Sequence, residues 1–162
     1  MAISRILSPG PLTGSSLTPA SMATCMSQPE HLFVYGTLRS EIGAGPARYL
    51  QEWARCIGPG RAQGQLYSVG DYPGMLPASA EDEWVWGEVY RIEEAASLYR
   101  LLDAYEGCDG SSPVPHEYSR GCVEVELAGG RRLMAACYWY AWPVIGLERI
   151  VSGDYVGWRQ QK

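Results

Sequence analysis

The order of apolar and polar residues along the chain predicts mostly strands. Val123, Val125 and Leu127 alternate with glutamates, which predicts a strand with one face in solvent. Residues 32–35 and 84–92 are short runs rich in apolar and aromatic side chains, and both are expected to be strands. These three segments are the first strands of a predicted sheet.

Glycine and proline mark where the other predicted strands bend, turn and end. Residues 57–69 are rich in glycine but carry spaced apolar side chains, so they are expected to form one bent strand. Residues 71–74, Asp-Tyr-Pro-Gly, have the composition of a turn. Gly129-Gly130 predicts a hairpin. Its return strand, residues 131–140, is almost continuously apolar, so we expect burial on both faces.

A helical period extends from Glu93 to Glu106. One apolar stripe is formed by residues at i, i+3, i+4 and i+7, namely Leu98, Leu101, Leu102 and Tyr105. Gly107 follows at the position where a helix end favours a residue in the left-handed conformation. This segment is therefore the clearest predicted helix of the chain.

Two smaller elements complete the predicted fold. A short helix is expected from Pro46 to Trp53, because proline is favoured in the first turn of a helix. A short final element is expected around residues 152–155. Because strands outnumber helices, the pattern predicts an α+β fold, a small mixed barrel-like sheet with one or two packed helices.

The first thirty residues differ in composition from the rest of the chain. They are rich in Ser, Thr, Pro and Gly, and every Phe, Tyr and Trp of the protein lies beyond residue 31. Such a segment buries too little apolar surface to offset its ordering entropy. We therefore predict a disordered N-terminal extension over residues 1–30 and one domain over residues 31–162.

Charge and composition argue against several classes of partner. The net charge is −5 and Lys162 is the single lysine, which argues against binding to nucleic acid. No segment approaches the ~20 apolar residues of a membrane span, so no membrane partner and a cytoplasmic location are expected. Five cysteines without C-x-x-C spacing make a zinc site or a disulfide framework unexpected.

The first candidate for chemistry is the segment Tyr35-Gly36-Thr37-Leu38-Arg39, which follows a predicted strand. A strand that breaks at a glycine exposes consecutive backbone N–H groups at its end. Converging amide dipoles of this kind suit a carboxylate or carbonyl oxygen. The alternative is that the glycine only relieves crowding where the strand turns.

The second candidate is Glu106, at the end of the predicted helix. The helix dipole disfavours a carboxylate there by roughly 0.3–1 kcal/mol, and enclosure by aromatic residues would raise its pKa further. A carboxyl group that titrates near neutral pH can take up a proton and return it. The alternative is a solvent-exposed glutamate that merely ends a helix.

Together, Tyr35-Gly36-Thr37-Leu38-Arg39 and Asp103-Ala104-Tyr105-Glu106-Gly107 resemble the γ-glutamylcyclotransferase-like family, also described as AIG2-like or BtrG-like. The resemblance runs from about Leu32 to Asp154. It implies a small mixed α/β fold in which Glu106 is the catalytic general acid/base. It also implies that the loop Gly36, Thr37 and Leu38 cradles a γ-glutamyl group and that Tyr35 forms part of the wall.

The same resemblance implies further substrate-binding residues. Arg39 could anchor a substrate carboxylate or pair with an acid such as Asp103. Tyr118, followed by Arg120, matches a Tyr-x-Arg pattern and is expected at the pocket wall. Tyr72 begins a Tyr-Pro-Gly turn that is expected to contact the leaving group.

The function implied is cyclisation of a γ-glutamyl amide, a dipeptide or an amine derivative, to 5-oxoproline with release of the amine. This reaction requires no metal, no cofactor and no nucleophilic side chain. The expected partner is a small γ-glutamyl substrate, and the oligomeric state is left open. The alternative is a non-catalytic module that binds a γ-glutamyl or amino-acid ligand on the same fold.

Overall fold

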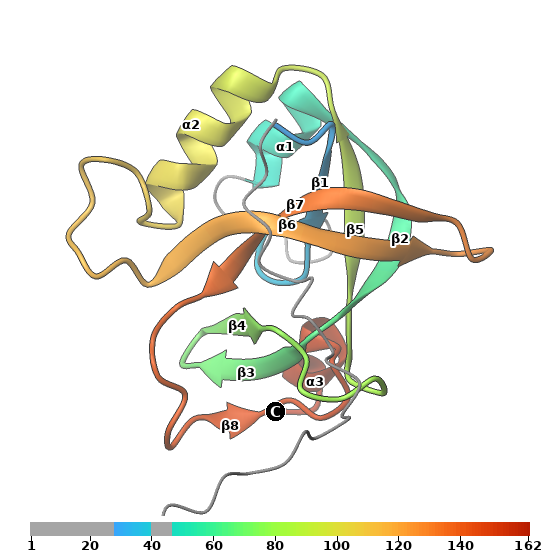
Figure 1. Ribbon diagram of the computed structural model, residues 1–162, viewed down its shortest axis with the longest axis vertical. Helices are drawn as coiled ribbons and strands as arrows, with labels where there is room; N and C mark the ends of the chain where they lie inside the picture. Colours follow the sequence, from blue (N-terminus) through green and yellow to red (C-terminus); the bar gives the residue numbers. More distant parts are fainter. Residues whose placement is uncertain (1–27, 40–46) are drawn as a thin grey trace, which may run out of the picture.

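The computed structural model of the protein describes residues 28–39 and 47–162. Its centre is a closed five-stranded barrel beside a three-stranded sheet (Figure 1). The barrel strands, in spatial order, are β1 (His31–Val34), β5 (Trp84–Ile92), β2 (Ala54–Gln63), β6 (Tyr118–Leu127) and β7 (Arg132–Tyr140). The small sheet has the order β4 (Tyr72–Leu76), β3 (Gln65–Val69) and β8 (Glu148–Arg149).

Helices flank both parts of this structure. α1 (Ala47–Trp53) and α2 (Ala95–Tyr105) lie together at one end of the barrel, and α3 (Tyr155–Gln160) lies near the small sheet (Figure 1). The predicted α+β class with a barrel-like sheet is confirmed. No described helix has the length and apolar character needed to cross a membrane.

The apolar side chains of β1 and β7 are divided between two cores. Phe33 and Tyr35 belong to a cluster with the barrel strands and the small sheet. Leu32 and Val34 belong to a second cluster with both helices α1 and α2. Successive side chains of a strand point to opposite faces. The six residues 135–140 of β7 are all buried in this way, so the expected burial on both faces is confirmed for this part of the strand, whereas Met134 before it is 49% exposed.

The single bent strand predicted over residues 57–69 is wrong. The chain forms β2 and β3 in two different sheets, and Gly64 separates them. The Gly64 N–H donates to the carbonyl of Glu83 at 3.0 Å, outside both ladders. The apolar pattern continues through the break because both strands contribute to one core, through Ala62 and Leu66.

The turn predicted at residues 71–74 is also displaced. The turn comes at Gly70 and Asp71, and the residues after it form β4, which pairs antiparallel with β3. Pro73 is tolerated in this strand because β4 lies at the edge of its sheet, where a missing N–H costs little.

The other predicted element boundaries differ from the observed ones by a few residues. The final element begins at Tyr155 as a helix rather than at residue 152. Pro46, the expected start of the first helix, and residues 1–27 of the predicted extension lie outside the described residues. The carbonyls of Pro29 and Glu30 accept hydrogen bonds from Tyr99 and Ile92, at 2.9 and 2.7 Å.

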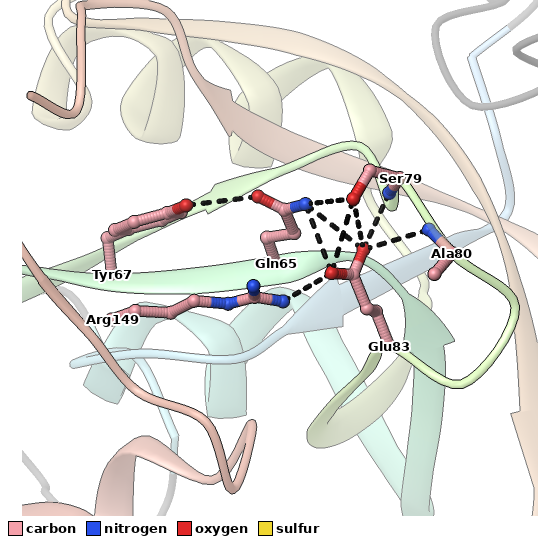
Figure 2. A network of polar contacts seen from close by, with 6 residues as sticks. All are labelled: Gln65, Tyr67, Ser79, Ala80, Glu83 and Arg149. Atoms are coloured by element: carbon pink, nitrogen blue, oxygen red, sulfur yellow. Dashed lines mark hydrogen bonds and ion pairs between the residues drawn. The ribbon is translucent and has the colours of Figure 1, made fainter.

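A network around Glu83 fixes the loop before β5 to the small sheet (Figure 2). Its carboxylate accepts hydrogen bonds from the backbone N–H groups of Ser79 and Ala80, at 2.6 and 3.1 Å. Gln65 of β3 donates to both carboxylate oxygens, at 3.2 and 3.1 Å, and Arg149 of β8 forms an ion pair with it. One carboxylate thus holds together a loop and two strands.

Candidate active site

A cavity of about 330 Å³ lies between the barrel, the small sheet and the end of α2. Its described lining consists of residues 32–38, 71–73, 105–106 and 117–118 together with Tyr138. These segments are the end of β1 with its following loop, the start of β4, the end of α2 and the start of β6. The volume is within the range of small-molecule sites, about 300–1,000 Å³.

The cavity brings together all but one of the residues predicted for the site. Its lining includes Tyr35, Gly36, Thr37, Leu38, Tyr72, Glu106 and Tyr118. Arg39 does not line it. The two segments that carried the family resemblance therefore share one hollow, although about seventy positions separate them in the sequence.

Glu106 is positioned by the end of α2. Leu98 and Leu102 are fully buried and fix the helix against the barrel. Glu106 caps the helix, and its N–H donates to the carbonyl of Leu102 at 2.8 Å. Gly107 follows with φ of 67°, a conformation that glycine adopts without steric cost, and ends the helix as predicted. The carboxylate thus belongs to a firmly held turn of backbone.

The environment of Glu106 favours the neutral carboxylic acid. Burial in the cavity wall, and then the negative charge of Glu117, raise its pKa to about 7. The helix end adds further negative potential. No described residue offsets these effects by donating a hydrogen bond to the carboxylate. A group with this pKa is present in both protonation states at neutral pH.

The loop at Gly36 is pressed against β4. A Cβ atom on Gly36 would lie 2.7 Å from Cγ of Pro73, so a larger residue would displace the loop or the strand. The loop is closed by a hydrogen bond from the Arg39 N–H to the Gly36 carbonyl at 3.0 Å. Crowding therefore does require glycine here, as the alternative interpretation held, and the loop still borders the cavity.

Two buried tyrosines form part of the cavity wall, and their hydroxyl groups already make hydrogen bonds within the protein. The Tyr35 hydroxyl donates to the Tyr138 carbonyl at 2.6 Å and accepts from the Met75 N–H at 3.3 Å. The Tyr118 hydroxyl donates to the Pro73 carbonyl at 2.8 Å. Burial raises the pKa of both phenols. These groups join the barrel to β4 and remain neutral at physiological pH.

Tyr72 and Glu117 form a polar pair in the cavity lining. Tyr72 Oη donates to Glu117 Oε1 at 2.8 Å. Burial and this hydrogen bond raise the pKa of Tyr72 to about 12. Glu117 was not among the predicted site residues, because a glutamate in a loop rich in Ser and Pro carries no periodic signal. Its one local hint is its place directly before Tyr118.

The arginines near the site have structural partners. Arg39 pairs with Asp154 at 2.9 Å, and Arg120 pairs with Asp103 at 2.9 Å. Tyr138 also donates to Asp103 Oδ1 at 2.7 Å. The alternative of a structural ion pair at Arg39 is therefore confirmed, with Asp154 as the partner in place of Asp103, which lies against β6 and β7.

Within residues 28–39 and 47–162, no three His, Cys, Asp or Glu side chains are grouped so that they could hold a metal ion. The chemistry that the described cavity offers is a carboxyl group with a pKa near neutral pH, a loop of backbone amides, two further carboxylates and tyrosine walls. This combination suits proton transfer on a small polar molecule.

This fold and this cavity define a small barrel protein with an acidic, tyrosine-walled pocket. The chain belongs to the gamma-glutamyl cyclotransferase, AIG2-like family, whose sequence model matches residues 32–158. It is 35% identical over 126 residues to the gamma-glutamylcyclotransferase family protein YtfP of Escherichia coli strain K12. That alignment covers 77% of this chain and 95% of the relative.

Solved structures agree with this assignment. The solution structure of ytfP from Escherichia coli is 33% identical, with a TM-score of 0.55 over 82% of this chain and 99% of that chain. The crystal structure of an aig2-like protein from Mus musculus has a TM-score of 0.60 at 24% identity, over 80% of this chain and 89% of that one. The second likeness shows the shared fold.

Proposed function

We propose that the protein converts a γ-glutamyl amide into 5-oxoproline and a free amine, with Glu106 as general acid/base. The observation that carries this proposal is that Glu106, with a pKa of about 7, borders the same cavity as the Gly36 loop. Membership of the gamma-glutamyl cyclotransferase family supports the reaction type. The raised pKa of Glu106 supports the acid/base role that the resemblance implies for it.

In the proposed first step, ionised Glu106 removes a proton from the α-ammonium group of the substrate. The freed amine attacks the γ-carbonyl carbon of the same molecule, a new C–N bond closes the five-membered ring, and the carbonyl oxygen gains negative charge. Both reacting groups belong to one molecule, so a pocket that holds the bent conformer supplies several kcal/mol through proximity alone.

In the second step, the tetrahedral intermediate collapses. The carbonyl forms again, the original amide C–N bond breaks, and Glu106 returns its proton to the departing nitrogen. The ring nitrogen loses its extra proton, which the released amine takes up to leave as an ammonium ion. The backbone N–H groups of Gly36, Thr37 and Leu38 are the proposed donors to the glutamyl oxygens. Donors held in fixed positions stabilise the negative charge that develops on such an oxygen. Proton uptake and return by one group require a pKa near the working pH.

The test is release of 5-oxoproline, followed by mass spectrometry, from a panel of γ-glutamyl dipeptides and γ-glutamyl amines. Release by the wild type and its loss in Glu106→Gln would support the proposal. Tight binding without turnover would identify a binding module instead. Equal turnover by the variant would exclude Glu106 as the acid/base.

A further inference from the structure

The described charged residues that line the cavity are all acidic. The described residues that line it include three carboxylates, Asp71, Glu106 and Glu117, and no Arg, Lys or His. A γ-glutamyl amide brings an α-carboxylate of its own, for which the proposed donors are the amides of the Gly36 loop. With Glu106 as the acid/base, the remaining carboxylates, Asp71 and Glu117, are available to the other part of the substrate, the leaving amine.

The lining also has a deep part and a mouth. Tyr35, Leu38 and Tyr118 are at most 6% exposed, whereas Tyr72 and Tyr105 are 37% and 48% exposed. The small glutamyl group fits the enclosed part beside the Gly36 loop. A leaving amine of variable size then extends toward the exposed tyrosines at the mouth.

Glu117 is held in place at this mouth from two sides. Its side chain accepts the hydrogen bond from Tyr72 Oη at 2.8 Å. Its backbone carbonyl accepts a hydrogen bond from the Ala141 N–H at 2.8 Å. The loop that precedes it is tied to the end of β7, because Trp142 Nε1 donates to the Pro115 carbonyl at 3.1 Å. A carboxylate fixed before binding loses little conformational entropy when a ligand arrives.

No basic residue of the described chain forms an ion pair with Glu117. The aromatic rings beside it add a second feature. Tyr72 and Tyr118 lie with ring centroids 6.4 Å apart, and Tyr105 lines the same cavity. Aromatic faces attract cations through their quadrupole, most strongly where solvent is partly excluded. A carboxylate beside the faces of tyrosine rings is a combination of side chains that suits the binding of an ammonium group.

We propose that Glu117 is a specificity-determining residue that selects leaving amines bearing a second, positively charged amino group. This inference rests on the proposed function. It assigns the protein to γ-glutamyl derivatives of diamines rather than to γ-glutamyl peptides, whose leaving group carries a carboxylate that Glu117 repels. Tyr72 acts as a positioning residue, because it orients the Glu117 carboxylate.

The experiment compares three γ-glutamyl amides of similar length that differ in terminal charge. They are the amides of 1,4-diaminobutane (positive), n-pentylamine (neutral) and 4-aminobutanoic acid (negative). The expected order of kcat/KM in the wild type is positive, neutral, negative. An exposed ion pair is worth up to ~1 kcal/mol, so Glu117→Gln should reduce the positive-to-neutral ratio by about fivefold.

The ratio of two substrates cancels any change that the variant makes to Glu106 or to folding. Tyr72→Phe keeps the charge and removes the tether, so its ratio should fall by less. Glu124→Gln is the matched control, because Glu124 lies on β6, the strand that follows Glu117, is exposed and pairs with Arg132. Its ratio should equal that of the wild type.

Two results would overturn the inference while leaving the reaction intact: a wild type that prefers the neutral or negative substrate, or a ratio unchanged in Glu117→Gln. Absence of 5-oxoproline from all three amides would contradict the proposed reaction instead. Calorimetric binding of the same amides would then decide the inference separately. Affinity ranked by charge would support it, and equal affinities or no binding would overturn it.

Discussion

Two glutamates of this protein occupy partly buried positions and have opposite pKa shifts. At Glu106, burial and the charge of Glu117 raise the pKa to about 7. At Glu83, burial also acts to raise the pKa. Hydrogen bonds from Ser79, Gln65, Arg149 and Ala80 outweigh it and lower the pKa to about 2 (Figure 2).

The difference teaches that burial raises the pKa of a carboxyl group here only where too few hydrogen-bond donors offset it. Glu83 has donors from a loop and two strands, so it stays ionised and serves as a structural anchor. Glu106 has the end of a helix and a second carboxylate nearby, so it can exchange a proton at neutral pH. The first arrangement stabilises the fold, and the second leaves a group free for chemistry.

The strongest test of this contrast between the two glutamates removes the titrating group of Glu106. The change Glu106→Gln keeps the shape of the side chain and removes its basicity. General acid/base catalysis typically contributes 10²–10⁴-fold, so we expect kcat to fall by about 10³-fold. The measurement is 5-oxoproline release from a γ-glutamyl amide that the wild type turns over. Glu124→Gln should retain wild-type activity, and a decrease under about tenfold in Glu106→Gln would argue for a different base.

The corresponding change at the anchor should affect stability instead. Glu83→Gln replaces one of two accepting oxygens by an amide NH₂ group, which cannot accept a hydrogen bond from the donors around it, so we expect a loss of about 2 kcal/mol in the free energy of unfolding. Urea denaturation at pH 7 measures this loss. The neighbouring exposed Glu81 supplies the control variant, Glu81→Gln, which should unfold like the wild type. Wild-type stability in Glu83→Gln would mean that the network in Figure 2 contributes little.

The two glutamates should also give stability opposite dependences on pH. The lowered pKa of Glu83 means that its contribution is present above pH 4.5 and is lost as the pH falls toward 2. The raised pKa of Glu106 means that its contribution is present below pH 4.5 and is lost as the pH rises through 7. Glu106→Gln should therefore be more stable than the wild type at pH 8, by roughly 1–2 kcal/mol. The difference should vanish near pH 4, and a constant difference across this range would contradict the assignment.

The pH dependence of activity gives a smaller effect. Ionised Glu106 is the proposed base, so kcat/KM should rise with pH and level off above about 7. At pH 6 it should be about tenfold below its plateau, because about a tenth of the groups are ionised. Initial rates between pH 5 and 8, with stability checked at each pH, provide the measurement. An acidic limb near pH 4.5 would show that the carboxyl group is not perturbed in the working enzyme.

The smallest expected effect comes from the second carboxylate. Glu117→Gln removes the negative charge that helps to raise the pKa of Glu106. The acidic limb of kcat/KM should move to lower pH by less than one unit, since burial, the larger cause, remains. The shift is read from the pH profile of a neutral substrate, so that the charge of the leaving group does not contribute. A shift to higher pH would mean that Glu117 acts on Glu106 by another route.

Much of the fold could be predicted because it depends on local patterns. Strand β5 begins and ends at Trp84 and Ile92 as expected, and Gly107 ends α2 in the predicted conformation. Residues 57–69 could not be assigned correctly, because apolar residues on both sides of Gly64 face one core. Periodicity reports which side chains are buried, and it does not report which sheet a strand joins.

The residues of the candidate site were likewise predictable from the sequence only in part. Glu106 and the Gly36 loop could be proposed from short motifs, since each lies where a helix or a strand ends. The sequence by itself determined most of the strand and helix pattern, the family, and an acid group with an unfavourable helix position. The tertiary structure alone decided that Glu117 lies beside Glu106, that Tyr72 holds it, and that Arg39 pairs with Asp154. The physical reason is that charges interact through space, and the folded chain sets those distances.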